Sequence, residues 1–142
     1  MYAKKAPDFP LLNHSLQVLE IQSFKHFLEQ EGENFIQQRY TNIERSVSDT
    51  GERRIQYLAG RWATKGAIAS ILGQDNMRLG SAHAARSHCW LEIEILRLPT
   101  GQPSVALFSQ CREIATRLGI KRWFLSISHT STYAVASVAV GK

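Results

Sequence analysis

Cysteine is scarce in this chain of 142 residues: Cys89 and Cys111 are the only two, and they do not form a CxxC pair. A domain of this length buries a core large enough to fold without disulfides or a structural metal. In a cytosolic protein, two cysteines so far apart are expected to be free thiols rather than a disulfide or a metal site. None of the histidines has the spacing of a zinc site.

Long apolar runs are also missing. The longest, such as the run from Tyr133 to Val140, are far too short to cross a bilayer as a helix. Residues 1–13 contain two lysines but no apolar core with a small-residue cleavage site, so we expect no secretory signal. The sequence has no internal repeat and no low-complexity tract. We therefore expect a cytoplasmic protein that does not enter a membrane.

The charge is moderately basic, with 17 Lys and Arg against 12 Asp and Glu and a formal net charge of +5. This balance favours an anionic partner, which could be nucleic acid, a phosphate-rich cofactor or an acidic protein. The basic residues are scattered in pairs, without the aromatic pattern of an RNA-recognition domain, zinc-finger spacing or heptads. Nucleic acid is therefore the least favoured of these partners.

Hydrophobic patterning predicts an α+β fold, in which a small, mostly antiparallel sheet packs on one long helix. Residues 1–13 are expected to form an extended arm and residues 14–142 a single domain. The expected elements, in chain order, are a strand at 15–21, a helix from 23 that breaks at Gly32, a loop at 48–54, the long helix at 56–73, strands at 90–95 and 105–108 joined by a turn at 99–103, a helix at 109–119, and two strands on either side of 128–132.

Two cations on the long helix are candidates for phosphate binding. Arg61 and Lys65 are four residues apart, so they project from the same helix face. Arg53 can join them from the helix entry. An arginine offers a planar fork to phosphate oxygens and a lysine offers a point charge. The alternative interpretation is an ordinary solvated basic face.

The segment "SISHTSTYA", from Ser126 to Ala134, offers hydroxyl groups and one imidazole between two predicted strands. His129 can donate a hydrogen bond to a phosphate or take part in proton transfer, because histidine changes its charge near neutral pH. The alternative is a loop histidine with no role. The sequence has no GxSxG nucleophile elbow, which argues against an α/β-hydrolase triad.

The motifs "YLAGRWATKGA", "WLEIEI", "TGQP" and "LSISHTSTYAVASV" resemble, in order and spacing, those of the small holo-acyl-carrier-protein synthases. The stretches "NFIQQRYTNIE" and "SLQVLEI" resemble two further elements of that family, and the resemblance covers roughly residues 14–140. The family consists of 4′-phosphopantetheinyl transferases, which load acyl or peptidyl carrier proteins from coenzyme A. The resemblance therefore implies a phosphopantetheinyl transferase fold, a homotrimer and a place in fatty acid biosynthesis.

Carried over by position, the resemblance implies roles for individual residues. Coenzyme A phosphates would be bound by Arg53, Arg61 and Lys65. His129 and Thr130 would line the nucleotide cleft, and Gly101 and Pro103 would shape the turn beside the adenine. His129 and Lys65 are the candidate catalytic residues. In the family the site lies between neighbouring subunits, so these side chains need not converge within one chain.

The chain departs from the family pattern at the two positions that hold magnesium. Gln17 stands where the family has an aspartate, and Gly66 where it has a glutamate. Magnesium prefers carboxylate oxygens, so both changes weaken its site. Two further family cations fall on Ser70 and Gln38. Three functions stay open: a magnesium-dependent transferase, a non-catalytic relative that binds coenzyme A or a carrier protein, and a basic cleft that binds another pyrophosphate or nucleic-acid ligand without chemistry.

Overall fold

The computed structural model describes residues 10–74 and 89–142, and the expected arm lies largely outside them. Within these residues no helix is long and apolar enough to cross a membrane. The elements are, in chain order, β1 (Leu11–Glu20), α1 (Ile21–Glu31), α2 (Glu33–Arg39), α3 (Asn42–Arg45), α4 (Gly51–Ile71), α5 (Cys89–Glu92), β2 (Ile93–Arg97), β3 (Pro103–Leu107), α6 (Ser109–Arg117), β4 (Arg122–His129) and β5 (Tyr133–Gly141).

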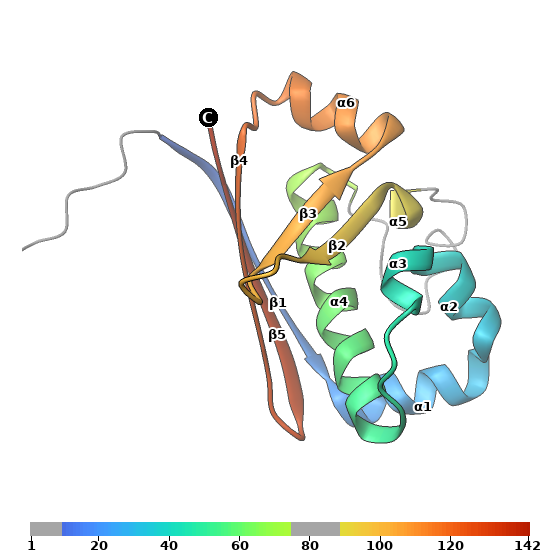
Figure 1. Ribbon diagram of the computed structural model, residues 1–142. Helices are drawn as coiled ribbons and strands as arrows, with labels where there is room; N and C mark the ends of the chain where they lie inside the picture. The colour runs from blue at the N-terminus through green and yellow to red at the C-terminus, as the bar shows by residue number, and fades with distance from the viewer. Residues whose placement is uncertain (1–9, 75–88) are drawn as a thin grey trace, which may run out of the picture.

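The strands form two antiparallel sheets, which confirms the predicted fold class. The larger sheet has the order β1-β5-β4, and β2 and β3 form a separate hairpin. In Figure 1 the long helix α4 packs along the larger sheet, and α1, α2 and α3 lie on the other side of α4. The β2–β3 hairpin lies beside α4, and β3 also contacts β4 of the larger sheet (Figure 1).

Alternation along β5 explains how the larger sheet packs on α4. Ala134, Ala136, Val138 and Val140 are fully buried, because every second side chain of a strand faces the same side. On α4, Gly60 permits a close approach, since a Cβ built at this glycine would lie 3.0 Å from Ile127 Cγ2. A side chain at position 60 would therefore push β4 away from the helix.

The boundaries of several elements differ from the expected ones. The helix α4 begins at Gly51 rather than at residue 56, so most of the expected loop at 48–54 is its first turn. The strand β1 begins at Leu11 and takes three residues from the expected arm. The predicted break at Gly32 is confirmed: its φ is +72°, a left-handed conformation that favours glycine.

The expected strand at 90–95 is wrong in its first part, because Cys89–Glu92 forms the short helix α5 and β2 starts at Ile93. A hairpin turn then reverses the chain, where the N–H of Gly101 donates to the carbonyl of Leu98 at 2.8 Å. Gly101 has a φ of +88°, which explains why a glycine stands there. The turn presents residues 97–103 toward the N-terminal half of α4.

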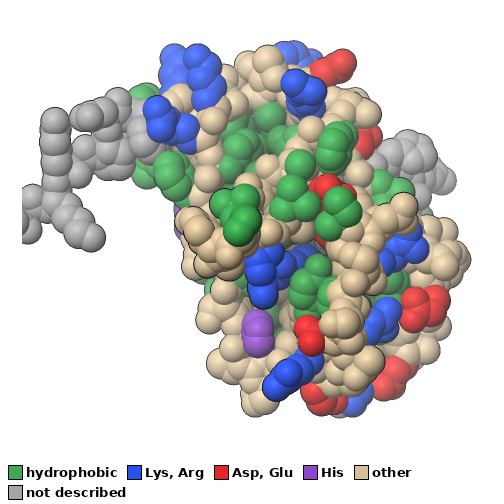
Figure 2. Space-filling view, in the orientation of Figure 1, with side chains coloured by type: hydrophobic (Ala, Val, Ile, Leu, Met, Phe, Trp, Pro, Cys, Tyr) green, Lys and Arg blue, Asp and Glu red, His purple; other side chains and the backbone are tan. Residues whose placement is uncertain are grey.

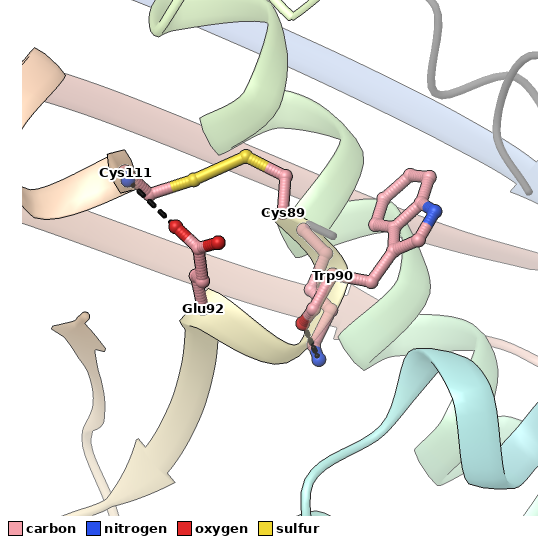
Figure 3. Close-up of a disulfide and its surroundings, with 5 residues drawn as sticks. Cys89, Trp90, Glu92 and Cys111 are labelled. Carbon is pink, nitrogen blue, oxygen red and sulfur yellow. Dashed lines mark hydrogen bonds between the residues drawn. A yellow bond between two sulfur atoms is a disulfide. The ribbon is translucent and has the colours of Figure 1, made fainter. Parts of the chain in front are cut away.

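The two cysteines are joined to each other, so the prediction of free thiols is wrong. The Cys89–Cys111 disulfide links α5 to α6, with a Cα–Cα distance of 6.3 Å. Figure 3 shows it beside Glu92, whose Oε1 accepts a hydrogen bond of 2.8 Å from the backbone N–H of Cys111. Spacing alone could not reveal the pair, because only the tertiary fold brings α6 next to α5.

Candidate functional site

A cleft of about 810 Å³ opens between α4, the β2–β3 hairpin, the end of β4 and the segment that follows α3. Figure 2 shows lysine and arginine side chains gathered near a histidine on the face of the molecule that it presents. The lining combines polar and charged groups with apolar walls. It consists of Ile43, Ser46, Val47, Ser48, Asp49, Arg53, Gln56, Tyr57, Gly60, Arg61, Ile95, Leu96, Arg97, Gly101, Pro103, Ile127 and His129.

Arg61 is the innermost cation of the cleft. It is only 6% exposed, and its guanidinium carbon lies 4.2 Å from the centre of the Tyr57 ring, which makes a cation–π contact. Burial lowers the pKa of Arg61 from its ordinary value, and the positive charge of Arg97 lowers it further. The buried Nε of Arg61 has no hydrogen-bond partner within the described residues. A buried N–H without an acceptor is costly, so the side chain is prepared for an anionic ligand.

Five of the residues expected from the sequence line this one cleft: Arg53, Arg61, Gly101, Pro103 and His129. They come from α4, the hairpin and the end of β4, which are far apart in the sequence. Sequence reasoning missed Tyr57, which supports Arg61, and Arg97 at the end of β2. The signal for Arg97 was present, since Ile93, Ile95 and Arg97 alternate along the strand and the first two are buried.

Lys65, which was expected to contact phosphate, does not line this cleft in the structure. Its side chain is fully buried, and Nζ lies 2.6 Å from Oε1 of the equally buried Glu44. Nζ also donates hydrogen bonds of 2.7 Å to the carbonyls of Arg39 and Trp90. Burial lowers the pKa of Lys65, while Glu44 opposes that shift. All three N–H groups of the ammonium are occupied, so Lys65 holds α2, α3 and α5 onto α4.

Thr130 also differs from its expected place in the cleft. Its Oγ1 accepts hydrogen bonds from the backbone N–H groups of Thr132 and Tyr133, at 3.1 and 3.0 Å. These bonds shape the turn between β4 and β5. Thr130 therefore positions the end of β4, and with it His129, instead of lining the cleft itself.

The two positions that the resemblance assigns to magnesium ligands are neighbours in space. A Cβ built at Gly66 would lie 3.8 Å from Cγ of Gln17, so the helix and β1 meet at this corner. The nearest atoms to that Cβ all belong to the neutral side chain of Gln17. Within the described residues, no three His, Cys, Asp or Glu side chains lie close enough to hold a metal ion together. The residues present do not fit magnesium, which needs carboxylate oxygens.

Three carboxylates that could serve as alternative metal ligands are engaged in other contacts. Glu44 binds Lys65 through Oε1 and accepts a 2.9 Å hydrogen bond from the N–H of Ile95 through Oε2. Glu92 accepts from Cys111, and Oε1 of Glu20 accepts a 2.7 Å bond from the hydroxyl of Ser23. The structure therefore has two separate features: the basic cleft, and a corner formed by Gln17 and Gly66 that does not line the cleft.

The chain forms an α+β domain with a basic cleft, and relatives of one class match most of its length. A holo-[acyl-carrier-protein] synthase of Chloroflexus aurantiacus is 36% identical over 132 residues, covering 90% of this chain and 96% of the relative. The enzyme of the same name from Dehalococcoides mccartyi is 34% identical over 128 residues, 90% of this chain and 97% of the relative.

The fold agrees with solved structures of the same class. The complex of the Chronobacterium ammoniagenes synthase with CoA matches with a TM-score of 0.71 and 26% identity, over 90% of this chain and 95% of that one. No protein-family model matches the sequence. This chain belongs to the holo-[acyl-carrier-protein] synthase family.

Proposed function

We propose that this protein binds coenzyme A in the basic cleft and transfers its 4′-phosphopantetheine group to a serine of an acyl or peptidyl carrier protein. Carrier proteins of fatty acid biosynthesis are the expected acceptors, and the cytoplasm is the expected compartment. The observation that carries the proposal is the buried Arg61, whose Nε has no acceptor among the described residues, in a cleft that also holds Arg53 and His129. Membership in a family whose members are named for this reaction supports it.

In the proposed reaction the serine oxygen forms a bond to the phosphorus that carries the pantetheine arm, and the bond from that phosphorus to the bridging oxygen breaks. The serine proton is released and adenosine 3′,5′-bisphosphate leaves. The contribution of this chain is to hold the phosphate groups with the guanidinium groups of Arg53 and Arg61, as charge-assisted hydrogen bonds. His129, which is exposed at the edge of the cleft, is proposed to donate a hydrogen bond to a phosphate.

The Arg61→Gln variant tests the cleft assignment. Losing one charge-assisted interaction weakens binding by about 1.5–3 kcal/mol, so the dissociation constant of coenzyme A should rise by at least about tenfold. Isothermal titration calorimetry measures the change, with Arg112→Gln on α6 as a matched control outside the cleft. Equal affinity of the Arg61 variant and the wild type would show that coenzyme A binds elsewhere.

A second function is favoured by the neutral corner at Gln17 and Gly66. Without carboxylates at the two implied metal positions, the protein is proposed to act instead as a non-catalytic relative, which binds coenzyme A or a carrier protein. Mass spectrometry of an apo carrier protein, incubated with coenzyme A and this protein with and without magnesium, distinguishes the two functions. Modification of the serine supports transfer, whereas tight coenzyme A binding without modification supports the binding protein.

A homotrimer forms part of the proposal, because the cleft and the Gln17–Gly66 corner do not meet within one chain. A second copy can supply the missing part. The face of the larger sheet that points away from α4 supports this assembly. It carries exposed apolar side chains on all three strands: Leu16, Val18, Phe124 and Tyr133, between 47% and 59% exposed. We name these residues the outer sheet face, and further copies of the chain are its proposed occupants.

The Val18→Glu variant tests this assembly. Val18 is 59% exposed, so the substitution does not disturb the fold of a single chain. A buried, unpaired carboxylate between copies is unfavourable. We therefore expect the variant to sediment as a monomer in analytical ultracentrifugation while the wild type sediments as a trimer. Leu118→Glu, at a similarly exposed apolar residue beyond the outer sheet face, should leave the assembly unchanged. A monomeric wild type would refute the homotrimer.

A further inference from the structure

Three contacts join the two chain segments that flank the β2–β3 hairpin, and together we name them the hairpin base. The Cys89–Cys111 disulfide is the covalent contact. The carbonyl of Glu92 accepts a 2.9 Å hydrogen bond from the N–H of Phe108, and Oε1 of Glu92 accepts the 2.8 Å bond from the N–H of Cys111. Figure 3 shows the disulfide and the Glu92 carboxylate close together. The hairpin therefore lies within a covalently closed ring.

The two segments that the hairpin base joins are anchored unequally. Helix α5 is fixed to α4, because the ring centre of Trp90 lies 4.2 Å from that of Trp62 and the Trp90 carbonyl accepts a hydrogen bond from Nζ of Lys65. Among the described elements, α6 packs chiefly on α5, and its buried side chains are Cys111 and Ala115. The disulfide is therefore the covalent connection that holds α6, and with it the end of β3, against the anchored helix α5.

The far end of the same hairpin forms one wall of the basic cleft. Arg97, Gly101 and Pro103 line the cleft from that end. The two strands are paired along their whole length, from Ile93 opposite Leu107 to Arg97 opposite Pro103. Since a hairpin tends to open as one cooperative unit, freedom gained at the hairpin base reaches this wall. Contacts of β2 with α3 and α4, and of β3 with β4, limit the movement.

The disulfide is accessible to a small thiol from one side, because Cys111 is fully buried whereas Cys89 is 7% exposed. In thiol–disulfide exchange, the thiolate of a low-molecular-weight thiol attacks the sulfur of Cys89, forms a mixed disulfide with it and displaces the sulfur of Cys111 as a thiolate. A second molecule of the thiol then releases Cys89. The small thiol is oxidised to its own disulfide, and the two cysteines take up the protons that the small thiols gave up.

We propose that the Cys89–Cys111 disulfide is a reversible redox switch: reduction by a low-molecular-weight thiol opens the hairpin base and loosens the hairpin wall of the cleft. The proposal deepens the proposed function and rests on it for the compartment and the ligand. A disulfide in the cytosol is usually transient or redox-sensing, which fits a bond that small thiols open and small disulfides close again. The oxidised protein has the ordered wall, and the reduced protein must order it when a ligand binds.

Hydrogen–deuterium exchange of the full chain without ligand, measured by mass spectrometry, tests the hairpin directly. One sample is equilibrated with glutathione disulfide and the other is reduced with dithiothreitol, and alkylation counts the free thiols in each. Reduction should make the amides of residues 93–107 exchange at least about tenfold faster, because the hairpin opens more easily. The amides of β5, at the centre of the larger sheet, should respond less. Free thiols in the oxidised sample, or unchanged hairpin exchange after complete reduction, would overturn the proposal.

Two variants control for other effects of the reducing agent. Cys89→Ala and Cys111→Ala each remove the disulfide and leave a different cysteine in place. In both variants the hairpin should exchange as fast as in the reduced wild type, and dithiothreitol should not change the rate. The Cys89 variant is needed because Cys111 is fully buried, and its truncation also leaves a cavity. Hairpin exchange as slow as in the oxidised wild type would contradict the proposal.

Isothermal titration calorimetry with desulfo-coenzyme A, which lacks the thiol and so cannot reduce the disulfide, connects the hairpin base to the cleft. The oxidised wild type should bind about three- to tenfold more tightly than the reduced wild type, because ordering the loosened wall reduces the affinity. Both variants should bind equally in the two buffers. Equal affinity of the oxidised and reduced wild type would overturn the effect on the cleft. If neither form binds while hairpin exchange still responds to reduction, the proposed function fails and the redox-sensitive hairpin base stands.

Discussion

Replacing Lys65 with methionine is expected to lower the free energy of unfolding by about 3–5 kcal/mol, the usual cost of breaking a buried ion pair. The substitution keeps the length of the side chain but leaves the buried carboxylate of Glu44 without its cation. It also removes the donor for the carbonyls of Arg39 and Trp90. For a domain of this size the loss corresponds to a decrease of roughly 10–20 °C in the unfolding midpoint.

Thermal and urea unfolding followed by circular dichroism measure this effect. The matched control is Lys25→Met, since Lys25 pairs with Glu52 on the surface and its loss should barely change the unfolding midpoint. A Lys65→Met protein that is as stable as the wild type but no longer binds coenzyme A would contradict the structural role. Such a result would instead support the role in phosphate binding that the sequence suggested for Lys65.

The Gln17→Asp and Gly66→Glu double variant is expected to increase transfer to a carrier protein by about 100-fold or more in the presence of magnesium. Each restored carboxylate adds about 1.5–3 kcal/mol of charge-assisted binding, so two together reach this range. The geometry permits the change, because a Cβ at Gly66 meets Gln17 only at ordinary contact distances of 3.8 to 4.0 Å. Gly66 lies within a regular helix, so a glutamate there also costs no backbone strain.

The measurement is the rate of phosphopantetheine transfer by mass spectrometry, over a magnesium titration. The control is Gln17→Asn with Gly66→Gln, which introduces similar side chains without charge and should not raise the rate. In the wild type, calorimetric titration with magnesium alone is expected to show no specific site. A millimolar or tighter site in the wild type, or an unimproved double variant, would show that these two positions do not limit the reaction.

Two basic residues of the long helix α4 look alike in the sequence but lie in different environments. Arg61 and Lys65 are four residues apart, yet one opens into the cleft and the other is enclosed by α2, α3 and α5. The difference comes from what packs on the helix. Glu44 and the Trp90 carbonyl bind the ammonium group of Lys65, whereas the guanidinium group of Arg61 stacks on Tyr57 and lines the cleft.

Local sequence patterns were sufficient to predict a large part of the secondary structure. The period-2 alternation of β5, the helical spacing of α4 and the break at Gly32 each depend on residues close in sequence, and each was predicted in type. The start of α4 was missed because Gly51–Ile55 carries turn-forming and charged residues. In the structure this first turn lies beside distant residues, as the surface ion pairs Arg54–Glu33 and Lys25–Glu52 show, and such neighbours are not visible in the local pattern.

The sequence by itself determined the α+β class, the family and the presence of Arg53, Arg61 and His129, because these follow from motifs and periodicity. It also determined that Gln17 and Gly66 bring no carboxylate. The tertiary structure alone decided that Lys65 pairs with Glu44, that Cys89 meets Cys111, and that Arg97 joins the cleft. These contacts join segments 21 to 36 residues apart, and burial, charge and reach can be judged only once the packing of helices and strands fixes their distances.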